Sequence, residues 1–172
     1  CALERSGKTW YACIATNHRQ KKLGRKEHHL IAAICLEDRN GLLFNGRRLS
    51  RGRAQQEDLM TVCGAGRLWI SPFSAPLFAP WQERLVVAED FLCRAGPGAV
   101  CFVEDRPLLP VLDRLEALIL YRWNRTYPAD VYLDLDPAAE GFVLEQQSEF
   151  SGTSHPCITR EIYRRGGGYG KT

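Results

Sequence analysis

The sequence has no long hydrophobic run, because no apolar stretch reaches the roughly eighteen residues that a membrane-spanning helix needs. Its first residues, Cys-Ala-Leu-Glu-Arg, lack the basic region and the apolar core of a secretory signal. There is also no repeat at a fixed period and no extended linker. These absences argue against a membrane protein, a secreted protein and a repeat array. We therefore expect a soluble cytoplasmic protein.

Cysteines with the spacing of a metal site are missing as well. No Cys-x-x-Cys pair occurs, so the sequence gives little support for a zinc site built with His18, His28 or His29, and we expect no bound metal. The cysteines are odd in number and several stand in apolar runs, which indicates reduced thiols rather than disulfides. The seven are Cys1, Cys13, Cys35, Cys63, Cys93, Cys101 and Cys157.

What the sequence does contain is the composition of an ordinary globular protein. It has 172 residues, of which 45% are hydrophobic and 25% are charged. A chain of this length can bury roughly 70% of the surface that it exposes when unfolded. We expect a basic N-terminal extension over residues 1–29, one compact domain over residues 30–165 and a flexible glycine-rich tail over residues 166–172.

Positive charge is concentrated in the first third of the chain. Residues 1–53 carry 12 Lys and Arg against 4 acidic residues, although the whole chain has a net charge of only +3. The two basic clusters lie in residues 18–26 and 47–53. They suit an anionic partner, such as RNA or an acidic protein surface, although a solvated surface without a partner has the same composition.

Apolar runs and helix signals alternate along residues 30–121. Strands are expected at 30–36, 67–70, 84–88, 99–103 and 115–121, and those at 30–36, 84–88 and 99–103 are expected to be buried because they are rich in apolar residues. Helices are expected between them at 50–63, 71–78, 90–96 and 105–112, opened by Ser50, Ser71, Asp90 and Asp105 as caps. This alternation is typical of a parallel sheet. Three further strands, at 131–135, 142–150 and 157–163, predict an antiparallel hairpin at the end.

This order of elements resembles the dihydrofolate reductase fold. The run Leu30-Ile31-Ala32-Ala33, the turn at Asn40-Gly41, the segments 101–103 and 115–121 and the ending 142–150 with 155–165 are similar to that family in composition and position. The resemblance covers roughly residues 30–165. It implies an α/β fold with a mostly parallel central sheet, helices on both faces and an antiparallel C-terminal hairpin. It also implies NADPH-dependent reduction of a pterin or a related heterocycle.

The chain departs from that family at the turns that would hold the cofactor phosphates. The family uses glycine-rich turns before two helices, whereas the matching turns here are Ser71-Pro72-Phe73-Ser74 and Glu104-Asp105-Arg106-Pro107. In the second turn Asp105 can accept the free N–H groups, Pro107 lacks a donor and Glu104 would repel a pyrophosphate. We therefore expect no ordinary NADPH binding.

The resemblance also implies a carboxylate on the first helix that assists protonation of the pterin. Matching that helix from either end places Arg53 or Gln55 at the corresponding position. Glu57 and Asp58 are the nearby acidic candidates, but each requires a shift along the helix. An exposed acid on an amphipathic helix is the usual alternative, so the catalytic residues stay unassigned.

Two segments are candidates for ligand contact. The family's mobile loop corresponds to residues 41–48, and arginines suit bidentate recognition of phosphate or carboxylate. In residues 121–125 aromatic and basic side chains alternate, a pattern that can stack nucleic-acid bases. Three functions stay open: an accessory protein for an anionic partner, an NADPH-dependent reductase, or an RNA-binding or RNA-processing protein. The candidate residues are Asn45, Arg47, Arg48, Arg51 and Arg53 in the first segment, and Tyr121, Arg122, Trp123 and Arg125 in the second.

Overall fold

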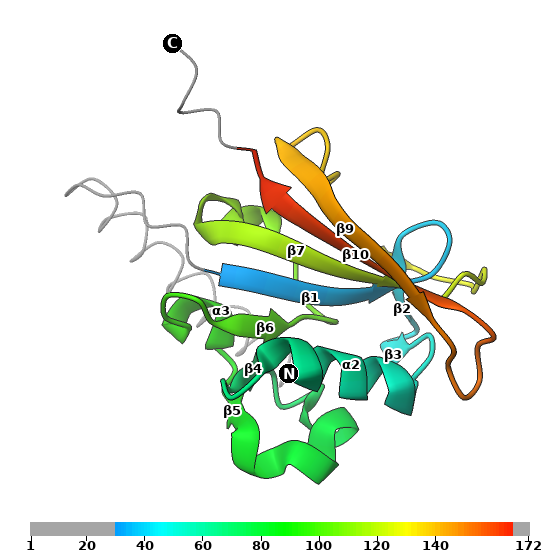
Figure 1. Ribbon diagram of the computed structural model, residues 1–172, viewed down its shortest axis with the longest axis horizontal. Helices are drawn as coiled ribbons and strands as arrows, with labels where there is room; N and C mark the ends of the chain where they lie inside the picture. Colours follow the sequence, from blue (N-terminus) through cyan, green and yellow to red (C-terminus); the bar gives the residue numbers. More distant parts are fainter. Residues whose placement is uncertain (1–29, 167–172) are drawn as a thin grey trace.

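The computed structural model describes residues 30–166, so the expected extension at 1–29 and all but the first residue of the expected tail at 166–172 lie outside the described residues. A seven-stranded sheet forms the centre of the domain (Figure 1). Across the sheet, the strands are β5 (Leu85–Val87), β4 (Leu68–Ile70), β6 (Val100–Phe102), β1 (Leu30–Leu36), β7 (Leu115–Arg122), β10 (Ile158–Arg165) and β9 (Phe142–Phe150).

The central strand β1 is buried because both of its faces are covered. It pairs in parallel with β6 on one side and with β7 on the other. One face packs against α2 (Arg53–Cys63) and the 3-10 helix η1 (Ala75–Arg84), through side chains such as Leu59 and Phe78. The other face packs against α3 (Phe91–Arg94) and the 3-10 helix η2 (Leu109–Arg114), through Phe91 and Val111. The continuous apolar sequence of β1 follows from this double coverage.

The last two strands reverse the direction of the sheet. Strand β10 pairs antiparallel with both β7 and β9, and Figure 1 shows these three long strands side by side. The mostly parallel α/β sheet with an antiparallel C-terminal hairpin is therefore confirmed.

A second, three-stranded sheet occupies the segment that the sequence presented as a loop. Strand β2 (Gly41–Phe44) pairs antiparallel with β3 (Arg47–Arg48) and with β8 (Val131–Tyr132). The turn between β2 and β3 is Asn45-Gly46, with φ of 52° and 70°. Positive φ at both positions is the signature of a tight hairpin turn, for which Asn-Gly is the favoured sequence. The expected strand at 131–135 is thus short and belongs to this sheet.

The helix beginnings differ from the expected ones. Helix α2 begins at Arg53 and its N-cap is Gly52, whereas Ser50 was expected to cap it. Ser50 Oγ instead lies 3.4 Å from Nε2 of His155. A Cβ at position 52 would lie 3.3 Å from Trp123, so the packing of the indole explains why a residue without a side chain stands there. Asp90 is the N-cap of α3 but makes no side-chain cap hydrogen bond.

Two of the four expected α-helices are 3-10 helices instead. The helix expected at 71–78 is η1, which begins at Ala75, extends to Arg84 and contains Pro80 between the non-helical residues Phe78 and Trp81. Proline restricts φ and donates no hydrogen bond, which disfavours a regular α-helix there. The helix expected at 105–112 is η2, which begins only at Leu109. Strand β5, expected to be buried, is an edge strand with half-exposed side chains.

Within residues 30–166, no helix is both long and apolar enough to cross a membrane.

Cys35, Cys63, Cys101 and Cys157 are free thiols, and burial raises the pKa of the Cys101 thiol to about 12. A buried thiol with a raised pKa behaves as a small apolar side chain rather than as a nucleophile.

Candidate functional site

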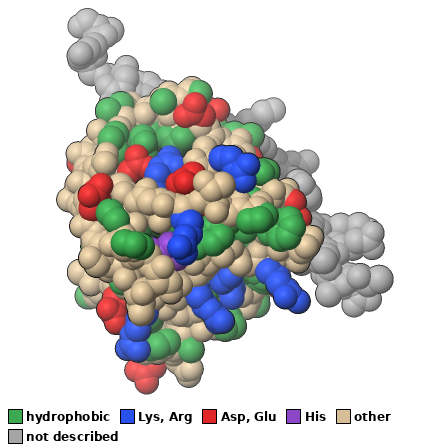
Figure 2. Space-filling view, turned by 90° about the vertical axis from the view of Figure 1, so that its right-hand side faces the viewer, with side chains coloured by type: hydrophobic (Ala, Val, Ile, Leu, Met, Phe, Trp, Pro, Cys, Tyr) green, Lys and Arg blue, Asp and Glu red, His purple; other side chains and the backbone are tan. Residues whose placement is uncertain are grey.

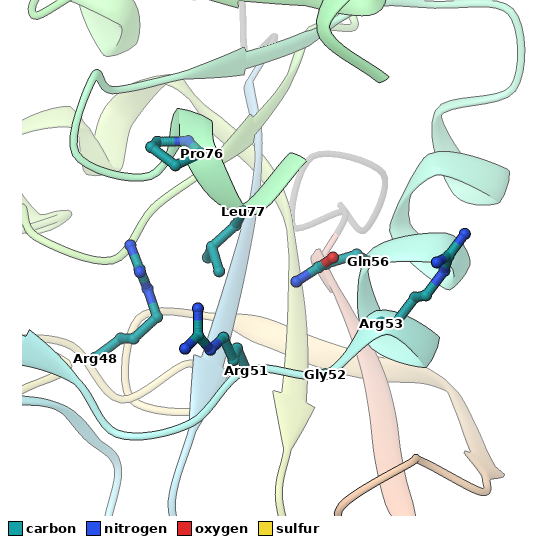
Figure 3. Close-up of a pocket in the computed structure, with 7 residues that line it drawn as sticks. All are labelled: Arg48, Arg51, Gly52, Arg53, Gln56, Pro76 and Leu77. Atoms are coloured by element: carbon teal, nitrogen blue, oxygen red, sulfur yellow. The ribbon is translucent and has the colours of Figure 1, made fainter. Parts of the chain in front are cut away.

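A cavity of about 310 Å³ opens where the chain enters α2 (Figure 3). In Figure 3 the Arg51 guanidinium points toward Leu77, across the mouth of the cavity, whereas Arg53 points away from it. Arg51 forms no ion pair within residues 30–166, but Arg53 pairs with Glu57 at 2.9 Å. No acidic side chain belongs to the lining, which consists of Arg48, Arg51, Gly52, Arg53, Gln56, Pro76 and Leu77.

The beginning of α2 is open on its polar side. Gly52 has no side chain to accept the N–H groups of the first turn, and no acidic residue stands in that turn. Gln56 is 8% exposed and its amide points into the cavity (Figure 3). That amide has no hydrogen-bond partner among the described residues. Free N–H groups, the unpaired Arg51 guanidinium and the Gln56 amide, which no described residue binds, face one space, and such a set of donors suits an anion.

Arg48 separates this first cavity from a second one and is itself paired. Its guanidinium donates to Glu104 at 3.2 and 3.3 Å and to the carbonyl oxygen of Phe73 at 3.1 Å. Ser74 Oγ donates to the same carboxylate at 2.6 Å. Burial raises the pKa of Glu104, although the hydrogen bonds from Arg48 and Ser74 act in the opposite direction.

The second cavity has a volume of about 580 Å³ and lies beside the β2–β3 turn. Its lining includes two rings and two arginines, namely Phe44, Tyr127, Arg47 and Arg48, together with Asn45, Leu49 and Pro128. On the side of the molecule where β2 and β3 lie, basic side chains stand next to hydrophobic ones (Figure 2). All lysines fall outside residues 30–166, so these basic side chains are arginines.

The Tyr127 ring is held from behind by a polar cluster. Its hydroxyl lies 2.8 Å from Nε2 of His155, and the imidazole stacks on Trp123 at a centroid distance of 4.7 Å. Burial, with a smaller contribution from the charge of Arg125, lowers the pKa of His155. The neutral imidazole therefore anchors Tyr127, and also reaches Ser50 in the segment between Arg48 and Arg51.

The turn that the family resemblance associates with a cofactor phosphate is filled by the chain itself. The N–H groups of Leu108 and Leu109 donate to Asp134 at 2.9 to 3.0 Å. Asp134 therefore takes the capping role that the sequence suggested for Asp105. Asp105 accepts instead from Ser71 Oγ at 3.4 Å, and burial raises the pKa of its carboxyl group.

The first phosphate turn is also closed by internal bonds. The N–H groups of Ser74 and Ala75 donate to the carbonyl oxygen of Ser71. Ser71 and Ser74 are fully buried, and Pro72 contributes no donor. The backbone N–H groups of Ser74 and Ala75 are therefore used inside the turn.

The acidic candidates on α2 lie away from the first cavity. Glu57 is exposed and paired with Arg53. Asp58 accepts from the Tyr121 hydroxyl at 2.6 Å and from Arg160 at 2.9 Å, which makes it a structural anchor between α2 and the sheet. Gln55, one of the two positions that matched the family's carboxylate, is 2% exposed and its Nε2 has no partner.

The segment 121–125 does not form the expected surface of alternating rings and arginines. Tyr121 and Trp123 are buried, so their faces are not available for stacking. Arg122 pairs with Glu161 and donates to Asn40 at 2.9 Å. Arg125 is exposed, and no contact between its guanidinium and an aromatic ring is recorded within residues 30–166. In contrast, each of the five candidates of the other segment lines at least one of the two cavities, and Arg48 lines both.

Three residues of the site were missed by the sequence reasoning. Gln56 lies one helical turn before Met60, on the buried face of α2. This spacing could have indicated from the sequence that its polar side chain is buried. Tyr127 and His155 had no such signal, because they come from loops separated by 28 residues. Within residues 30–166, no three His, Cys, Asp or Glu side chains lie close enough together to hold a metal ion.

The comparisons with known proteins place the fold but give little more. Neither the family models nor the curated protein sequences gave a match. Among solved structures, the chain is similar to dihydrofolate reductase from Enterococcus faecalis, which was determined as a complex with NADP(H) and RAB-propyl. The TM-score is 0.58 and the identity 9%, over 81% of this chain and 97% of that one. The chain therefore has a diverged dihydrofolate reductase-like fold.

Proposed function

We propose that this domain is a binding or accessory protein for an anionic partner, and that it does not bind NADPH in the ordinary way of the fold. The main support for this proposal is the set of unpaired donors around the first cavity. Arg51 and Gln56 both lack partners there among the described residues, and α2 begins without a cap. An anion would satisfy all three groups at once, since guanidinium, amide and helix N–H groups are all donors.

The two turns that carry phosphate in the resembled family support the second half of the proposal. Asp134 already occupies the donors before η2, and the buried carboxyl of Glu104 lies beside the turn after β4. A pyrophosphate would compete with one carboxylate and approach another, which is electrostatically unfavourable in a partly buried site. A reductase would need those donors, whereas an accessory protein does not.

Calorimetric titration with pyrophosphate tests the proposed anion site. The Arg51→Ala variant should bind about tenfold more weakly than the parent, because one charge-assisted hydrogen bond contributes about 1.5 to 3 kcal/mol. Arg67→Ala is the matched control: it removes the same charge from an exposed position beyond the other end of α2. It should bind like the parent protein. An equal loss of pyrophosphate affinity in both variants, or no binding by the parent protein, would overturn the proposed anion site.

A titration with NADPH separates the accessory protein from the reductase. NADPH should bind no more tightly than pyrophosphate, and the nicotinamide fluorescence should not change, because only its phosphates have a site. Micromolar binding with a fluorescence change that survives Arg51→Ala would favour the reductase instead.

A further inference from the structure

The second cavity gives the anionic partner a chemical identity. We infer that the partner is single-stranded nucleic acid, with one base in the second cavity and the neighbouring phosphates at Arg51 and the beginning of α2. This inference rests on the proposed anion site, which Arg48 joins to the second cavity by lining both. A ligand that combines planar rings with regularly spaced negative charges fits two such cavities in a row.

Two ring surfaces are available in the second cavity. Phe44 is 42% exposed, although it is a large apolar residue in a strand. The Tyr127 ring is half-buried and cannot turn freely, because its hydroxyl is bound to His155 and the imidazole packs on Trp123. A ring that is already ordered loses little conformational entropy when a base stacks on it.

Polar groups without partners stand next to these rings. Arg47 forms no ion pair within the described part of the chain. The side-chain amide of Asn45 likewise has no hydrogen bond there, since only its backbone N–H is used, by Asp130 at 3.0 Å. An amide can donate to and accept from the edge of a base, and an arginine can contact a phosphate or stack on a ring.

The charge around the cavity is consistent with a nucleic-acid phosphate chain. Neither lining contains an acidic side chain, and together the two contain Arg47, Arg48, Arg51 and Arg53. The carboxylates nearby are engaged: Glu104 by Arg48, Glu57 by Arg53 and Asp130 by the Asn45 N–H. An acidic protein surface would use the arginines but leave the exposed Phe44 ring without a partner.

Fluorescence anisotropy with two labelled oligonucleotides of equal length tests the inference in the full chain. One probe is oligouridylate and the other is its abasic counterpart, which carries the same phosphates without bases. The parent protein should bind oligouridylate about tenfold more tightly, because stacking contributes about 1 to 3 kcal/mol per base. Phe44→Ala should remove this preference, and Phe44→Leu should do the same while keeping an apolar side chain in β2.

Tyr132→Ala is the matched control, since Tyr132 is an exposed aromatic residue of the same small sheet that does not line the cavity. It should keep the preference. Equal affinity of the parent for both probes, with binding still lost in Arg51→Ala, would overturn the nucleic-acid inference but leave the anion site standing. Failure of the parent to bind either probe or pyrophosphate would overturn both.

Discussion

The turn before η2 and the beginning of α2 are both places where a helix of this fold presents free N–H groups, yet the chain treats them in opposite ways. At η2 the carboxylate of Asp134 accepts two of the N–H groups. At α2 the N-cap is Gly52, and no side chain takes that role. The same physical need for an acceptor is met from inside the protein in one region and left to the surroundings in the other.

The arginines follow the same division. Arg48 points at the carboxyl ends of β4 and β6 and is neutralised by Glu104. Arg51, three residues later, forms no ion pair within residues 30–166 and lies in a cavity lining without acidic residues. Proximity in sequence therefore does not decide which arginine is available, and the tertiary partner does. The arginine that lacks an internal acid is the one to be expected at a ligand.

Removing the internal acceptor at η2 should give the largest change in stability. Asp134→Ala leaves the N–H groups of Leu108 and Leu109 without their partner, so it should lower the free energy of unfolding by about 1 to 2 kcal/mol. Urea-induced unfolding measures this. Asp105→Ala is the control, because Asp105 does not cap η2, and its loss should be clearly smaller. A larger loss for Asp105→Ala would mean that Asp105 is the cap after all.

Removing the carboxylate that pairs with Arg48 should leave this arginine available for an anion, as Arg51 is. Glu104→Gln removes the charge that neutralises Arg48 while keeping the shape of the side chain. Because Arg48 lines both cavities, pyrophosphate should bind about fivefold more tightly, which corresponds to about 1 kcal/mol for a partly exposed ion pair. Calorimetry checks this, with Asp105→Asn as a charge-matched control. Unchanged affinity would show that Arg48 is not part of the anion site.

The pH dependence of stability should also distinguish Glu104. Its pKa is raised in the folded protein, chiefly by burial. The folded state therefore holds a proton that the unfolded state releases above about pH 4.3. The parent should lose stability relative to Glu104→Gln as the pH rises from that value through the folded pKa, and the difference should then level off. A parent that gains relative stability over this window would mean that the pKa of Glu104 is lowered instead.

A carboxylate placed at the beginning of α2 should give the smallest change in stability. It would supply this helix with the internal negative charge that Asp134 already supplies to η2. Ala54→Glu puts a negative charge in the first turn, which should raise the free energy of unfolding by about 0.5 kcal/mol. The same charge should weaken pyrophosphate binding about threefold, equivalent to about 0.7 kcal/mol. Ala54→Gln, which adds similar bulk without charge, is the control. Thermal unfolding measures the change in stability, and calorimetry measures the change in affinity. Equal pyrophosphate affinity of the two variants would contradict the expected role of the charge.

Several elements could be predicted closely from the sequence because their local signals agree with their tertiary setting. The strand expected at 30–36 is β1, and the strand expected at 142–150 is β9. In contrast, η1 and η2 follow turns whose serine, aspartate and proline residues are also compatible with a short α-helix. The Asn45-Gly46 pair carried a hairpin signal, but the resemblance to a family with a mobile loop led to the interpretation of a loop.

The arginines of the candidate site were visible in the sequence as a cluster, because charge and spacing are local properties. Their partners were not visible, because Glu104 lies 56 residues from Arg48 and Asp134 lies 26 residues from Leu108. Whether a charge is neutralised depends on which strand ends meet at one edge of the sheet. The sequence by itself determined the alternation of strands and helices and the concentration of positive charge. Only the tertiary structure decided which donors are satisfied internally, since that depends on contacts between segments that are distant in the chain.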